Sequence, residues 1–178
     1  MVPPGDDGAV TADPGRYARA EWERRWLLAE APPGLVAPRR IEDRYLDRTR
    51  LRLRQVTDGE GTVVRKLGQK VRVRPDDPSG VWLTSMYLDD DEYVALVALP
   101  GREMVKTRSD WPAGGCVVDV FEGPLAGLVV AEAERPDAES LLDAPAPPDA
   151  GREVTGDDRF SGGRLAALDA AGLAELLA

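Results

Sequence analysis

The sequence has no histidine and a single cysteine, Cys116. Without histidine it can form no Ser-His-Asp triad, no Cys-His dyad and no metal site built on imidazole. One thiol can form neither an intramolecular disulfide nor a zinc site built from cysteines. Any metal ion must therefore be held by oxygen ligands, which favours Mg²⁺, Mn²⁺ or Ca²⁺.

Long apolar runs are also missing from the sequence. The longest of them, such as residues 126–131, are too short to span a bilayer. The first residues contain no basic region followed by an apolar stretch, so they do not have the pattern of a secretory signal. We therefore expect a cytoplasmic protein without a membrane partner.

Basic and acidic residues are unevenly distributed along the 178 residues. The net charge is −9, yet basic residues gather between residues 39 and 74, and acidic residues dominate after residue 75. A basic middle in an acidic chain favours a site for a small anion, and the overall charge argues against nucleic acid as a partner. The composition predicts a flexible tail over residues 1–16 and a single domain over residues 17–178. The oligomeric state, monomer or homodimer, stays open.

Most of the chain alternates charged and apolar residues, which is the two-residue period of a β-strand. The first such stretch places Glu21, Glu23 and Arg25 on one face, and Trp22 and Trp26 on the other. The same alternation predicts strands over residues 19–28, 48–55, 63–74, 81–88, 102–108, 116–121 and 128–134.

Turns and helices account for the remaining stretches. Residues 58–61, Asp-Gly-Glu-Gly, predict a hairpin, whereas residues 30–40, with three prolines, predict a loop. Helices are predicted over residues 91–99, capped by Asp89, and over residues 162–178. Together these elements predict an α+β fold built on an antiparallel sheet or a closed barrel.

Charges of the same sign recur two residues apart in four of the predicted strands. On a strand such residues share a face about 7 Å apart, where they repel unless an opposite charge lies between them. Solvated sheet faces usually mix signs, so this repetition favours a function. Carboxylates can hold a divalent cation, and basic residues can bind phosphate oxygens. The pairs are Glu21 with Glu23, Arg52 with Arg54, Lys106 with Arg108, and Glu132 with Glu134.

The order of the charged motifs resembles a known family. The motifs are Glu21-Trp22-Glu23-Arg24-Arg25, Arg52-Leu53-Arg54, Leu67-Gly68-Gln69-Lys70, Lys106-Thr107-Arg108, Asp119-Val120-Phe121 with Glu132-Ala133-Glu134, and Glu153-Val154-Thr155. In this order they resemble the CYTH domain, also called the triphosphate tunnel metalloenzyme family, which includes class IV adenylate cyclases and thiamine triphosphatases. The resemblance spans nearly the whole chain.

The resemblance implies an eight-stranded antiparallel β-barrel with a few flanking helices, whose charged face points inward as a tunnel. It also implies a metal-dependent triphosphatase that uses Mg²⁺ or Mn²⁺, with inorganic triphosphate as the first expected substrate. Two alternatives stay open: a class IV adenylate cyclase, and a non-catalytic module that binds triphosphate or polyphosphate.

The resemblance also assigns roles to residues of this chain. The implied metal ligands are Glu21, Glu23, Asp119, Glu132 and Glu134. The implied substrate-binding residues are Arg52, Arg54, Lys66, Lys70, Lys106 and Arg108, and the implied catalytic residues are Glu23, Arg25 and Lys70.

Three positions depart from the family pattern. Arg25 replaces the lysine of the first motif, and arginine keeps the charge but cannot readily lose a proton. Gly68 replaces the threonine of the Leu-Thr-x-Lys motif, and no tryptophan precedes Glu153 in the stretch 147–152. These departures motivate the non-catalytic alternative.

Overall fold

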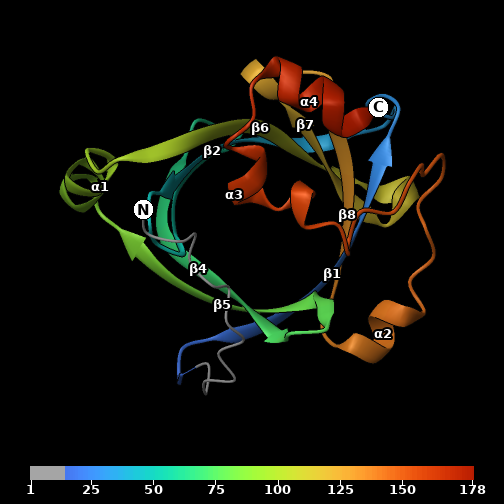
Figure 1. Cartoon of the computed structure of the whole chain (residues 1–178), viewed down its shortest axis with the longest axis horizontal. Coiled ribbons are helices and arrows are strands. Elements are labelled where there is room, and N and C mark those ends of the chain that lie inside the picture. The colour runs from blue at the N-terminus through green and yellow to red at the C-terminus, as the bar shows by residue number, and fades with distance from the viewer. Residues whose placement is uncertain (1–14) are drawn as a thin grey trace, which may run out of the picture.

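Eight antiparallel strands close into a barrel in the computed structural model, which describes residues 15–178 (Figure 1). Around the ring the strands follow the order β1-β5-β4-β3-β2-β6-β7-β8, and the pairing of β8 with β1 closes it. The predicted α+β barrel is therefore confirmed. Residues 1–14 of the predicted tail lie outside the described residues. The strands are β1 (Arg19–Leu28), β2 (Val36–Leu46), β3 (Leu51–Thr57), β4 (Val63–Arg74), β5 (Asp77–Leu88), β6 (Gly101–Trp111), β7 (Cys116–Phe121) and β8 (Val129–Arg135).

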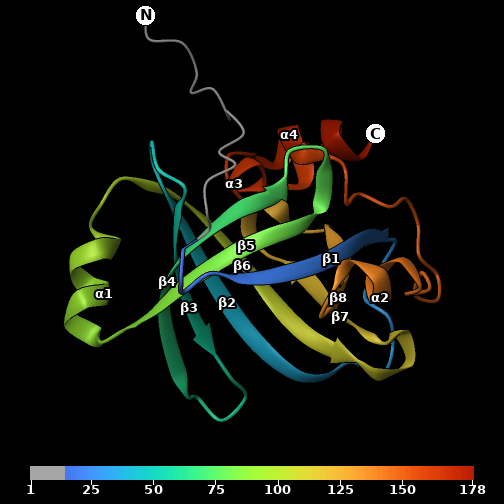
Figure 2. The same cartoon turned by 90° about the horizontal axis from the view of Figure 1, so that it is seen from below.

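Short helices flank the barrel. Figure 2 shows α1 and α2 on opposite sides of it, while α3 and α4 lie together near the C-terminus. Within residues 15–178 no helix is long and apolar enough to cross a membrane. The helices are α1 (Asp90–Val97), α2 (Ala138–Leu142), α3 (Gly162–Leu165) and α4 (Ala170–Leu177).

The strand register turns the charged faces inward. In an antiparallel pair, residues directly opposite each other share a face of the sheet. Glu23 lies opposite Glu134 across β1 and β8, and Arg108 lies opposite Asp119 across β6 and β7. The alternate residues face the other way: Val118, which is completely buried, belongs to an apolar cluster on the outer face of these strands.

The predicted loop over residues 30–40 is wrong in its second half, because β2 begins at Val36. The three prolines of residues 30–40 favoured a loop, so this strand was not predicted. Pro38 is tolerated because the β2–β6 ladder is irregular between Val36 and Arg39, and proline is compatible with a bulge. Past the irregularity, β2 pairs regularly with β3 and β6 as far as its last residues. β5 is also longer than predicted, since it already begins at Asp77.

The predicted helix over residues 162–178 is also wrong as a single element, because it divides into α3 and α4. Asp169 separates the two helices: its side chain accepts a hydrogen bond from the Gly172 N–H and caps α4. The predicted cap at Asp89 is confirmed, since its side chain accepts from the Glu92 N–H at the start of α1.

The C-terminal segment, residues 153–178, packs across one end of the barrel. In Figure 1, α3 lies within the outline of the strand ring. Phe160 and Leu165 of this segment are buried in one cluster with Phe121 of β7 and Val130 of β8. The backbone N–H of Val154 donates to the Arg25 carbonyl at 2.8 Å, which ties the segment to β1. The segment is therefore part of the main apolar core.

Candidate active site

A cavity of about 660 Å³ extends into the barrel and is lined by side chains from all eight strands and from the C-terminal segment. Lys66 is the one predicted site residue that does not line it. Lys66 lies opposite Arg54 in the β3–β4 ladder, but its ammonium stands 5.1 Å from the ring centre of Tyr87. The predicted residues that line the cavity are Glu21, Glu23, Arg25, Arg52, Arg54, Lys70, Lys106, Arg108, Asp119, Glu132 and Glu134.

The glutamates of the cavity come from the neighbouring strands β1 and β8. The Lys70 ammonium lies 3.1 Å from the carboxylates of both Glu21 and Glu23. Glu132 accepts a hydrogen bond of 3.1 Å from Arg108. The carboxylate of Glu134 has no hydrogen bond or ion pair within the described part of the chain. Arg19 also pairs with Glu21 at 2.8 Å, and Arg25 lies 3.9 Å from Glu23, so Glu134 is the one glutamate of this wall without a cationic partner within residues 15–178.

The pKa values of these glutamates reflect the uneven compensation. Burial, together with the charges of Glu21 and Glu132, raises the pKa of Glu134 above its ordinary value. Burial has the same tendency at Glu132, but Arg108 outweighs it and lowers the pKa to about 2. Lys70 and Arg19 likewise lower the pKa of Glu21 against the effect of burial.

A second wall of the cavity is basic and is organised by two buried aspartates. Asp119 accepts hydrogen bonds from Lys106 at 2.5 Å and from two nitrogens of Arg108 at 2.7 Å each. Asp43 accepts two from Arg54, at 2.6 and 2.7 Å. Although burial opposes ionisation, the adjacent cations hold the pKa of both carboxyls below the ordinary range. Each aspartate thus fixes the cations beside it.

The neighbours of Asp119 differ from those expected of a metal ligand. It was predicted as a metal ligand beside the glutamates, but both of its oxygens contact Lys106 and Arg108. The structure groups it with the basic wall. Within residues 15–178, moreover, no three carboxylates converge as a ready-made metal site, because Lys70 stands between Glu21 and Glu23.

Sequence reasoning missed Asp43. Asp43 lies in β2, which was not predicted as a strand because of the prolines in residues 30–40. The sheet face on which the Asp43 side chain lies could therefore not be assigned. A signal was present: Ile41, Asp43 and Tyr45 follow one another at the two-residue spacing of a strand, directly before the predicted strand that contains Arg54. The β2–β3 register places Asp43 opposite Arg54, which explains their contact.

Arg25 joins the acidic wall to the C-terminal segment. Its Nη1 donates to the Phe160 carbonyl at 2.9 Å, and its backbone N–H donates to the Thr155 hydroxyl at 2.9 Å. Its Nε lies 3.9 Å from Glu23 and, within residues 15–178, has no hydrogen-bond acceptor. Arg25 therefore acts as a structural contact as well as a charge of the cavity.

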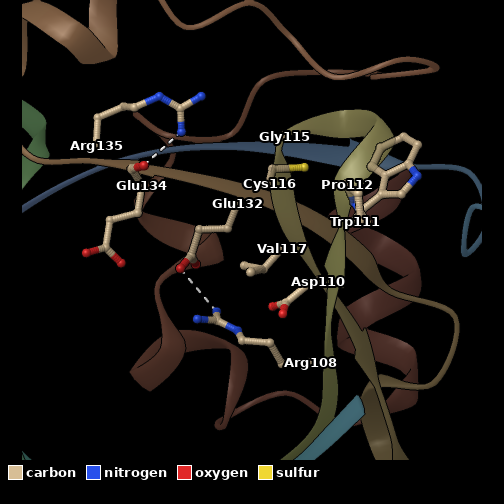
Figure 3. Close-up of a pocket in the computed structure, with 10 residues that line it drawn as sticks. All are labelled: Arg108, Asp110, Trp111, Pro112, Gly115, Cys116, Val117, Glu132, Glu134 and Arg135. Atoms are coloured by element: carbon tan, nitrogen blue, oxygen red, sulfur yellow. Dashed lines mark hydrogen bonds and ion pairs between the residues drawn. The ribbon is translucent and has the colours of Figure 1, made fainter. Parts of the chain in front are cut away.

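A smaller cavity of about 350 Å³ lies beside Arg108, Glu132 and Glu134 (Figure 3). Figure 3 shows Glu132 directed towards Arg108, whereas the carboxylate of Glu134 lies apart from both arginines drawn. Cys116 also lines this cavity, and burial raises the pKa of its thiol. The three shared residues connect the two cavities at the acidic wall.

Comparison with known proteins identifies structural neighbours. No protein-family model matches the sequence, and no curated protein matches it. The crystal structure of the inorganic triphosphatase NE1496 is 27% identical, with a TM-score of 0.53, and the match covers 82% of this chain and 93% of that one. A crystal structure described as the hypothetical protein NE1496 is also 27% identical, with a TM-score of 0.55 and coverage of 84% and 99%. Together with the closed barrel, these neighbours confirm the resemblance to the CYTH family.

Proposed function

We propose that this chain is a metal-dependent triphosphatase whose substrate is inorganic triphosphate. One observation carries the proposal: a single cavity places four glutamates on β1 and β8, and a basic wall on β3 and β6 of the same ring. A metal-bound triphosphate needs both kinds of surface, since oxygen ligands hold the cation and basic groups hold the phosphates. The neighbour NE1496, described as an inorganic triphosphatase, supports this choice of substrate.

The chemistry of the acidic wall fits a hard divalent cation. Its ligands are carboxylate oxygens, and the pKa of Glu134 is raised by burial first and then by the charges of Glu21 and Glu132, which a cation would offset. Mg²⁺ or Mn²⁺, when bound, would supply charge neutralisation for the phosphate oxygens. Glu21, Glu23, Glu132 and Glu134 would hold the cation, which requires Glu21 and Glu23 to release Lys70. Asp119 would join them only after its contacts with Lys106 and Arg108 open.

The basic wall is suited to bind phosphate oxygens. Arg54 and Arg108 are each held by two hydrogen bonds to a buried aspartate, so their remaining N–H groups have fixed directions. The buried Nε of Arg52 has no hydrogen-bond acceptor within residues 15–178, and it lies 3.6 Å from Asp43. A buried donor without an acceptor is costly, and a phosphate oxygen would satisfy it. Such prearranged cations stabilise charge that develops on a leaving phosphate.

Lys70 and Arg25 contribute charge rather than accept protons. Although burial opposes protonation, the neighbouring glutamates raise the pKa of Lys70, which therefore stays protonated at neutral pH. Arg25 contributes the charge of its guanidinium group. In this proposal Glu23 positions Lys70 through their 3.1 Å contact, and Lys70 contacts the substrate once Glu23 turns to the cation.

The test measures phosphate release from inorganic triphosphate, ATP and thiamine triphosphate with Mg²⁺ or Mn²⁺. Glu21→Gln/Glu23→Gln removes two charges of the acidic wall, and Glu60→Gln/Glu139→Gln, at two exposed positions outside the cavity, is the matched control. We expect release from triphosphate that the first variant abolishes and the control retains. Folded, metal-supplied protein that releases phosphate from none of the three would refute the proposal.

One observation favours a second candidate, a non-catalytic module that binds triphosphate. Arg25, which cannot accept a proton, is committed to the Phe160 carbonyl of the C-terminal segment. This candidate predicts tight calorimetric binding of triphosphate without turnover, whereas cyclic AMP formed from ATP would indicate a cyclase instead.

A further inference from the structure

Unpaired arginines gather at one end of the main cavity. In residues 15–178, six guanidinium groups have no hydrogen bond or ion pair, although the protein carries a net charge of −9. Three of the six, Arg50, Arg102 and Arg164, line the cavity, and all three are exposed. The other three are Arg16, Arg48 and Arg74.

The three arginines surround the same end of the barrel, which Tyr45 marks. Tyr45 lies opposite Arg102 in the β2–β6 ladder and opposite Arg52 in the β2–β3 ladder. Gly162, the first residue of α3, packs so closely on Tyr45 that a Cβ there would lie 1.8 Å from the phenol oxygen. Arg164 follows in the same helix. The turn before β3, strand β6 and helix α3 therefore each bring one unpaired cation to this end.

Two of these arginines continue the basic surface of the barrel interior towards the end of the barrel. Arg50 directly precedes β3, and Arg52 is the second residue of that strand. On β6, Arg102 shares its face with Lys106 and Arg108 deeper in the barrel. Arg52 and Arg108 lie near buried aspartates, whereas Arg50 and Arg102 form no ion pair within residues 15–178. The basic surface thus continues beyond the interior and ends in uncompensated charge.

Among residues 15–178, the aromatic side chains that line the cavity give no exposed platform for a nucleobase. Phe121 and Phe160 line the cavity but are 5% and 2% exposed, within the apolar core. Tyr45, the remaining aromatic residue of the lining within residues 15–178, packs against that core and α3. Single-stranded nucleic acids and their bases are usually held by stacking on exposed aromatic rings. Unpaired guanidinium groups without such rings favour a chain of phosphates alone.

We propose that Arg50, Arg102 and Arg164 form an outer anion site for the phosphate groups beyond the third of a linear inorganic polyphosphate. This inference rests on the proposed function, because the first three phosphates occupy the basic wall inside the barrel. Each guanidinium can donate two parallel hydrogen bonds to a phosphate, and none of the three has to leave another partner first. Chains of four or more phosphates are then the preferred ligands.

The test compares the binding of inorganic triphosphate and of longer linear polyphosphate by calorimetry, with Mg²⁺ present. The outer-site variant is Arg50→Gln/Arg102→Gln/Arg164→Gln. The control, Arg16→Gln/Arg40→Gln/Arg65→Gln, removes the same charge from residues that do not line the cavity. Circular dichroism and thermal unfolding establish that both variants are folded. The quantity compared is the ratio of the two affinities, which removes effects common to both ligands.

We expect wild-type protein and the control to bind the longer chain more tightly than triphosphate. In the outer-site variant, the ratio of the affinity for the longer chain to the affinity for triphosphate should be about ten-fold smaller. Equal ratios in all three proteins would overturn the outer site while leaving the triphosphatase untouched. A wild-type protein that neither binds nor hydrolyses triphosphate would instead refute the proposed function. If the outer-site variant weakened the binding of an RNA with a 5′-triphosphate and not of polyphosphate, the assignment to inorganic chains would be wrong.

Discussion

Replacing Asp43 with asparagine tests whether a buried carboxylate organises the basic wall. The side chain of Asp43 is completely buried and accepts two hydrogen bonds from Arg54, while Arg52 lies 3.6 Å away. Asp43→Asn keeps the shape but removes the charge, so two largely buried guanidinium groups lose their counter-ion. Removing one partner of a buried ion pair costs about 3–5 kcal/mol of the free energy of unfolding. For a chain of this size that corresponds to a melting temperature lower by roughly 6–20 °C.

The same variant should respond more strongly to triphosphate than the wild type does. Phosphate oxygens would replace the missing carboxylate beside Arg52 and Arg54, so ligand binding restores stability lost by the mutation. Saturation at about 100 times the dissociation constant adds about 2.7 kcal/mol by mass action alone, which sets the scale of the effect.

The assay is urea unfolding of Asp43→Asn and of the control Asp47→Asn, each with and without triphosphate. Asp47 is exposed in the turn after β2 and its carboxylate has no partner within residues 15–178. We expect the control to unfold like the wild type. A loss below about 1 kcal/mol in Asp43→Asn would show that Arg52 and Arg54 do not depend on this carboxylate, and the argument for a prearranged basic wall would fail.

Three further predictions follow from the charges of the cavity. Because the pKa of Glu134 is raised in the folded protein, ionisation of this carboxyl destabilises the fold as pH rises through that pKa. Without added metal, Glu134→Gln should therefore melt at a higher temperature than the wild type at pH 7. With Mg²⁺ present, it should melt at a lower temperature than the wild type. Asp43, Asp119 and Glu132 have lowered pKa values, Glu132 at about 2, so their stabilisation is complete above their ordinary pKa and is lost in acid. Urea unfolding should show a level free energy from about pH 7 to 5 and a steep fall below about pH 4, and an equally steep loss between pH 7 and 5 would contradict this assignment. Arg25→Met removes the hydrogen bond to the Phe160 carbonyl and should cost about 1–2 kcal/mol in urea unfolding, and an unchanged midpoint would show that this contact does not hold the C-terminal segment.

Local patterns were enough to predict most of the strands. The range of β4, Val63–Arg74, and that of β7, Cys116–Phe121, follow directly from alternation, and Asp89 marks the start of α1. These features depend on neighbours within a few residues, so the sequence displays them. β2 was missed because Pro38 suggests a loop, and only pairing with β3 and β6 makes this stretch a strand.

The composition and the motifs of the sequence determined by themselves which chemistry is available: no imidazole, oxygen ligands only, and like-charged pairs on single strand faces. They could not determine which charges meet. Glu23 and Glu134 face each other because β8 closes the ring against β1, and Asp43 meets Arg54 because β2 pairs with β3 in one register. Lys66 has the spacing of its neighbours in β4, yet it lies beyond the cavity lining. A side chain's face is set by the two-residue period of its own strand, whereas its partners are set by closure of the barrel, which joins residues more than a hundred positions apart.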